Sequence, residues 1–129
     1  ICDIFCASIK KQVKNNKQAF WNHITLYLRS KNNWIVRVGL IIMLSYYLEE
    51  EYIEKVFKRC EAVKNEFYYV KMAQAWLIAT TWVKFPKKTE QYFKKSTLDK
   101  WIWNKAIQKA CESTRVEEEY KIYLKTLKK

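Results

Sequence analysis

Charged side chains recur every 34 residues along the chain, each inside an otherwise apolar stretch. The first is an aspartate in the opening "ICDIFC", and three cations follow at the same spacing: Asp3, Arg37, Lys71 and Lys105. A row of this kind can face a ligand of opposite charge. It can also form a ladder that pairs neighbouring repeats, and Asp3 beside Arg37 fits that alternative. The spacing leaves both interpretations open.

The stretches that carry these residues have the hydrophobic spacing of helices. Some place apolar side chains on one face, and others are apolar nearly all round, which is typical of buried helices. Asn32 or Asn33 is the expected N-cap of the third helix. We expect eight helices, within residues 1–9, 18–28, 32–48, 49–65, 67–85, 86–96, 96–113 and 114–129.

Polar residues also mark the starts of the last three expected helices. Pro86 suits the first turn of a helix, where its missing N–H costs nothing. Ser96 with Asp99, and Thr114 with Glu117, have the spacing of a capping box, with Asp in place of the usual Glu in the first pair. We therefore expect the last two helices to begin at Ser96 and Thr114.

The order of elements repeats along the chain. A nearly apolar helix alternates with an amphipathic one, and Trp34, Tyr68 and Trp101 recur at spacings of 34 and 33 residues. Two helices per repeat at this period describe an α-solenoid. The tetratricopeptide consensus residues are not in place, so HEAT-like repeats are the better match. The expected fold class is all-α, a single domain over residues 1–129 built as an α-solenoid of about four HEAT-like helical hairpins.

Composition favours helices and a polyanionic partner. One Gly and one Pro among 129 residues are too few for the tight turns of a β-rich fold. The formal net charge of +12 favours nucleic acid as the partner. With no CxxC pair and a single histidine, we expect no metal, no other cofactor and reduced cysteines in a cytoplasmic protein. The longest apolar run is too short to span a bilayer, so no membrane association is expected.

Three longer stretches carry a resemblance to a known family. These are "YYVKMAQAWLIATTWVKFP" (68–86), "LDKWIWNKAIQKACESTRVEEEYK" (98–121) and the opening "CDIFC". They resemble the DNA alkylation repair family, the AlkD-like HEAT-repeat glycosylases, and in particular its short bacterial branch. The resemblance implies an α-solenoid that grips duplex DNA in a concave groove. It also implies hydrolysis of the N-glycosidic bond of positively charged purines alkylated at N3 or N7.

The resemblance assigns roles to individual residues. Asp3 falls on the family's catalytic aspartate, Arg37 on its DNA-contacting arginine, and Trp76 on the second of two aromatic residues that flank the lesion. Lys71 and Lys105 share the register of Arg37 and are candidate phosphate contacts. The first flanking aromatic residue would precede the first residue of this chain. We therefore expect the chain to be the C-terminal part of a longer protein.

Each of these assignments has a structural alternative. Asp3 can pair with Arg37, and Trp76 can belong to the core, as tryptophans on apolar helices commonly do. The other five tryptophans are assigned mostly to the core: Trp21, Trp34, Trp82, Trp101 and Trp103.

Three functions follow from these observations. The first is a monomeric DNA glycosylase for cationic alkylated purines, acting on double-stranded DNA. The second is a HEAT-repeat module that binds duplex DNA without catalysis. The third is a protein-binding HEAT scaffold, against which the positive charge argues.

Overall fold

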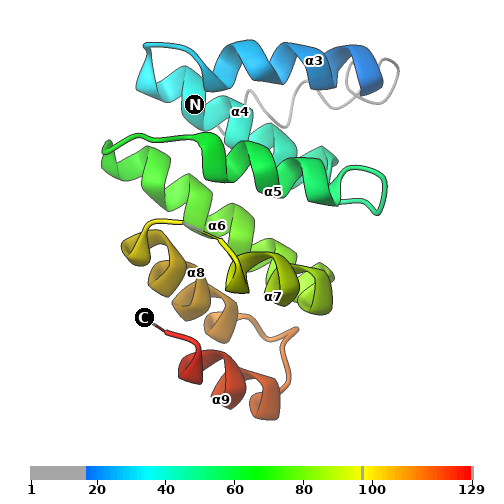
Figure 1. The fold of residues 1–129 in the computed structure, drawn as a ribbon, viewed down its shortest axis with the longest axis vertical. Helices are drawn as coiled ribbons and strands as arrows, with labels where there is room; N and C mark the ends of the chain where they lie inside the picture. Colours follow the sequence, from blue (N-terminus) through cyan, green and yellow to red (C-terminus); the bar gives the residue numbers. More distant parts are fainter. Residues whose placement is uncertain (1–16, 97, 129) are drawn as a thin grey trace. The chain divides into compact units, whose positions relative to one another are not determined.

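The computed structural model describes residues 17–96 and 98–128, and this part of the chain is all-helical, without strands. The all-α fold class is therefore confirmed there. Asp3 and the helix expected within residues 1–9 lie outside the described residues. The helices of the described part are labelled as in Figure 1: α3 (Lys17–Leu28), α4 (Asn33–Tyr46), α5 (Ile53–Ala62), α6 (Tyr68–Lys84), α7 (Pro86–Lys94), α8 (Lys100–Glu112) and α9 (Glu118–Thr126).

Two of the expected helix starts are confirmed in atomic detail. Asn32 is the N-cap of α4, and its side-chain oxygen accepts the backbone N–H of Trp34 at 2.9 Å. α7 begins at Pro86, which occupies its first turn. The first N–H groups of a helix have no partner within it. Asn32 accepts one of them, and Pro86 has no N–H to satisfy.

The expected starts of the last two helices, Ser96 and Thr114, are wrong. The Ser96 hydroxyl accepts a backbone N–H two residues further on (3.0 Å) in a local turn, and Asp99 caps α8 by accepting the N–H of Trp101 (2.7 Å). A carboxylate at the start of a helix is also favoured by the helix dipole, which a serine hydroxyl does not match. α9 begins four residues later than expected, because Thr114 lies in a turn that buries Val116.

The contacts of the chain divide it into two compact units. One unit ends at Ala73 and the other begins at Gln74, so that α6 runs through both. Each unit is described by itself below. The solenoid arrangement and the single domain over residues 1–129 stay predictions.

The single glycine of the chain lies where α3 and α4 pack together in the first unit. A Cβ at Gly39 would lie 3.0 Å from Leu28 Cδ2 and 3.2 Å from Tyr27 Cβ. The two helices therefore approach closely at this point, so that a Cβ at position 39 would require Leu28 to shift by a few tenths of an ångström. This contact fixes α4 against α3.

An aromatic cluster fills the core of the first unit. Trp21, Tyr47 and Tyr52 are buried, and their ring centroids lie 4.9 to 5.1 Å apart. The guanidinium of Arg59 lies 3.7 Å from the centre of the Trp21 ring and donates a hydrogen bond to the Trp21 carbonyl (2.7 Å). The Tyr47 hydroxyl donates to the carbonyl of Lys17 (2.7 Å), and burial raises the pKa of Tyr47 to about 12.

The second unit has its own aromatic core. Trp82, Phe93 and Trp103 are buried, and Trp103 meets each of the other two rings edge to face. The indole N–H of Trp103 donates to the Leu127 carbonyl (2.8 Å). This bond holds the end of α9 against α8. The assignment of Trp82 and Trp103 to the core is thereby confirmed.

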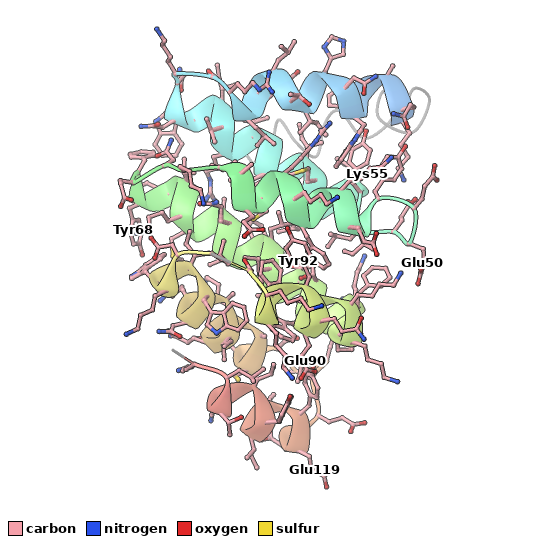
Figure 2. The ribbon with its side chains drawn as sticks, viewed as in Figure 1. Glu50, Lys55, Tyr68, Glu90, Tyr92 and Glu119 are labelled. Atoms are coloured by element: carbon pink, nitrogen blue, oxygen red, sulfur yellow. The ribbon has the colours of Figure 1, made fainter. Side chains whose placement is uncertain are left out.

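α7 and α9 are linked through one carboxylate, which Figure 2 labels near α9. Glu90 accepts a hydrogen bond from the Tyr123 hydroxyl and lies 3.1 Å from Lys94 Nζ. The bond from Tyr123, with help from the Lys94 ammonium, holds the pKa of Glu90 below its usual range.

Candidate nucleic-acid interface

The first unit holds two of the predicted cations, Arg37 on α4 and Lys71 on α6. Arg37 Nη1 donates to the carbonyl of Tyr69 at 2.8 Å, and Lys71 Nζ lies 3.6 Å from Glu66 Oε2. Both side chains are only partly exposed. Each is therefore held in place near the start of α6. The expected ladder between Asp3 and Arg37 stays a prediction, since Asp3 lies outside the described residues.

The second unit holds the other two predicted residues, Trp76 on α6 and Lys105 on α8. Trp76 is 39% exposed, whereas Trp82, on the same helix, is 2% exposed. The apolar composition of α6 did not distinguish the two. Trp76 is therefore partly exposed and not fully buried in the core, as Trp82 is.

Trp76 borders a hollow of about 310 Å³ between α6 and the C-terminal end of α8. Thr80 lies one turn further along α6, and its hydroxyl donates to the Trp76 carbonyl (2.9 Å). The hollow also carries two cations, Lys109 and Arg115, with Glu112 as the carboxylate among its lining residues. An aromatic ring beside two cations suits a ligand that combines a flat base with a phosphate.

Lys105 lies one helical turn before Lys109, so both project from the same side of α8. Trp101 precedes Lys105 by one further turn and is 37% exposed. Trp101, Lys105 and Lys109 therefore form one face of α8. This face carries an aromatic ring and two cations, and it ends at the hollow, which Lys109 lines. The 34-residue spacing predicted one member of this face, Lys105. Trp101 was assigned to the core, and Lys109 was not predicted.

Two of the tryptophans assigned to the core from the sequence are on the surface instead. Trp34 is 50% exposed and Trp101 is 37% exposed. Each is the second residue of its helix. Because Cα–Cβ bonds tilt toward the helix N-terminus, a side chain in the first turn reaches past the end of its helix. Trp21, Trp82 and Trp103, which lie further from the starts of their helices, are buried as expected.

A short sequence signal could have identified these surface aromatics. In three places among the described residues an Asn or Asp precedes an aromatic residue by two positions, and its side-chain oxygen accepts that residue's backbone N–H. The pairs, with the N···O distances, are Asn32 and Trp34 (2.9 Å), Asn65 and Phe67 (2.8 Å), and Asp99 and Trp101 (2.7 Å). The three aromatic positions are 33 and 34 residues apart, so the signal follows the repeat.

Neither a metal site nor a membrane span is found in the part of the chain that the structure describes. Within residues 17–96 and 98–128, no three His, Cys, Asp or Glu side chains group so as to hold a metal ion. Among the described helices, none combines the length and the apolar character needed to cross a bilayer.

Comparison of the chain with protein-family models, with curated proteins and with solved structures finds no match.

Proposed function

We propose that the chain is part of a DNA glycosylase that releases positively charged alkylated purines from duplex DNA. The observation that carries the proposal is the position of Trp76, which is 39% exposed beside a hollow that Lys109 and Arg115 also line. A core tryptophan would be buried, as Trp82 is. The resemblance of the sequence to the DNA alkylation repair family supplies the reaction, and the net charge of +12 supports a polyanionic substrate.

The chemistry needs little from the protein beyond electrostatics. Alkylation at N3 or N7 gives the purine a positive charge, so the base leaves as a neutral molecule when its glycosidic bond breaks. The bonding electrons go to the base, positive charge develops on the sugar, and water then adds to C1′ and loses a proton to solvent. A carboxylate near C1′ stabilises this charge and orients the water, and Asp3 is the proposed carboxylate.

Trp76 would contact the cationic base through its ring face. Cation–π contacts of this kind contribute about 0.5–2 kcal/mol. Arg37, Lys71 and Lys105 would neutralise phosphates, and each phosphate contact steepens the dependence of duplex binding on salt.

The test is release of 7-methylguanine from methylated duplex DNA by the full chain under single-turnover conditions. We expect release by the wild type, loss of release in Asp3→Asn with duplex binding retained, and slower release in Trp76→Ala. Glu119→Gln, an exposed substitution on α9 (Figure 2), is the control and should leave the rate unchanged. An Asp3→Asn variant that releases the base at the wild-type rate would contradict the catalytic assignment.

A second function is favoured by the aromatic and cationic face of α8, which does not depend on Asp3. In this alternative the chain binds duplex DNA without catalysis. Duplex binding by the wild type with no base release would favour this alternative. A protein-binding scaffold would instead show weak DNA binding that salt hardly affects.

A further inference from the structure

Four aromatic side chains gather at the starts of α4 and α6 in the first unit, and we call them the aromatic ledge: Trp34, Phe67, Tyr68 and Tyr69. Trp34 stacks on Tyr69 with ring centroids 5.4 Å apart and an interplanar angle of 29°. Phe67 meets Trp34 edge to face at 5.3 Å, and Tyr68 meets Tyr69 in the same way at 5.3 Å. Figure 2 shows Tyr68 at the start of α6, directed outward.

The aromatic ledge is open to solvent to a degree that packing does not explain. Trp34, Tyr68 and Tyr69 are 50%, 54% and 49% exposed. Aromatic side chains normally bury most of their surface, and three large rings gathered while half exposed form an apolar patch of the kind that marks a binding site.

The backbone beneath the aromatic ledge is fixed by side-chain hydrogen bonds. The connection from α3 to α4 and the connection from α5 to α6 lie at the same end of this unit (Figure 1), and Asn65 Nδ2 donates to Asn33 Oδ1 between them at 3.0 Å. Asn32 and Asn65 hold the N–H groups of Trp34 and Phe67, as described above. The rings are therefore presented on a preorganised support, which lowers the ordering cost of binding.

The charges around the aromatic ledge are mainly positive. The two connections carry Arg29, Lys31 and Lys64, with Glu66 as their carboxylate. Arg29 and Lys64 also line a hollow of about 480 Å³ between these connections, and none of the described residues that line it is acidic. The charged side chains of the two connections thus favour a polyanion over an uncharged or basic peptide.

We infer that the aromatic ledge binds a stretch of single-stranded DNA, with unpaired bases on the exposed rings and phosphates near Arg29, Lys31 and Lys64. Stacking on aromatic rings together with cations that follow the backbone is the way proteins hold single strands without sequence preference. Bases within a duplex already stack on one another and cannot use such a surface. The inference goes beyond the proposed function, which concerns duplex DNA and Asp3.

The experiment measures binding of the full chain to fluorescein-labelled oligothymidylate and, in parallel, to a labelled blunt-ended duplex of two strands at the same salt concentration. Trp34→Ala and Tyr69→Leu should each weaken single-strand binding about tenfold. Trp34→Phe keeps an aromatic face and should stay within about threefold of the wild type. Leu26→Ala, at a 65% exposed side chain on α3, is the matched control and should bind as the wild type does. Circular dichroism checks that each variant is folded.

Three results would overturn the inference. The first is unchanged single-strand binding in both Trp34→Ala and Tyr69→Leu. The second is an equal loss in Trp34→Phe and Trp34→Ala, because an aromatic face would then not be what binds. The third is a dimer at assay concentration that Trp34→Ala dissociates while single-strand binding is unchanged, which would identify a second copy as the occupant.

The same measurements separate this inference from the proposed glycosylase. Asp3→Asn should abolish base release and leave oligothymidylate binding intact. Failure of base release in the wild type would therefore leave the inference about the aromatic ledge standing, and loss of single-strand binding in Trp34→Ala need not alter base release from duplex DNA.

Discussion

The two units each expose tryptophan, but in different surroundings. In the first unit Trp34 belongs to a group of rings that support one another, and it is 50% exposed. In the second unit Trp76 has no ring contact with any described residue and borders a hollow beside Lys109 and Arg115. A supported group of rings offers a broad surface for successive bases, whereas a single ring beside a hollow suits one base. The same residue type therefore suits different ligands in the two units.

The largest expected effect is on the free energy of unfolding. It compares Trp82 with Trp76, which lie on the same helix, α6. Trp82→Ala removes a side chain that is 2% exposed and should lower the free energy of unfolding by about 3–5 kcal/mol. Trp76→Ala and Trp34→Ala remove partly exposed rings and should each cost less than about 1 kcal/mol. Urea denaturation followed by circular dichroism measures all three. A Trp76→Ala variant as unstable as Trp82→Ala would show that Trp76 contributes to stability as a core residue does.

The next effect concerns the support of the aromatic ledge. Gly39→Val places methyl groups where a Cβ alone would lie 3.0 Å from Leu28 Cδ2. We expect a loss of about 1–3 kcal/mol from overpacking, and weaker binding of oligothymidylate because α4 would shift. Gly39→Ala should cost much less, since the gain in helix propensity of about 1 kcal/mol offsets the close contact. Equal stability of the wild type and Gly39→Val would show that α3 and α4 can move apart freely.

A smaller effect concerns the hollow in the second unit and depends on the proposed function. Trp76→Ala should lower the rate of 7-methylguanine release about tenfold, within the 0.5–2 kcal/mol range of a cation–π contact. Trp34→Ala should leave that rate unchanged. If Trp34→Ala slows release as much as Trp76→Ala, the division of roles between the two units is wrong.

The smallest effect is a difference between the two units in how the stability of a Tyr→Phe variant depends on pH. In the second unit, Tyr123→Phe removes the hydroxyl that lowers the pKa of Glu90 and should cost about 1 kcal/mol at pH 7. A carboxyl group with a lowered folded-state pKa stabilises the protein above its unfolded pKa. That stabilisation disappears as the pH falls through the folded-state pKa. The difference between the wild type and Tyr123→Phe should therefore vanish in acid.

Tyr52→Phe in the first unit is the matched control for this pH dependence. The Tyr52 hydroxyl donates to the neutral amide of Gln18 at 3.0 Å, so the cost of losing it should not change between pH 3 and pH 7. Unfolding curves of both variants across this range make the comparison. A pH-independent cost for Tyr123→Phe would contradict the assigned role of Glu90.

The helices could be predicted because hydrophobic spacing and the scarcity of Gly and Pro act locally along the chain. The starts of α8 and α9 could not. Ser96 and Asp99 compete for the start of α8, and only the packed structure decides between them. At α9, Thr114 lies in a turn that buries Val116. The row of cations was visible in the 34-residue spacing. The exposure of Trp34 and Trp101 was missed, because an apolar composition does not show that a residue lies in the first turn of its helix. The Asn or Asp two positions earlier is the sequence signal for that position.

The pairing of Asn32, Asn65 and Asp99 with the residue two positions on has a consequence for redesign. Each asparagine or aspartate holds a backbone N–H and not the aromatic ring itself. Any residue other than proline offers the same N–H. The aromatic residues at positions 34, 67 and 101 can therefore be replaced without loss of these hydrogen bonds. Such a replacement changes what the surface recognises and leaves the backbone at this point as it is.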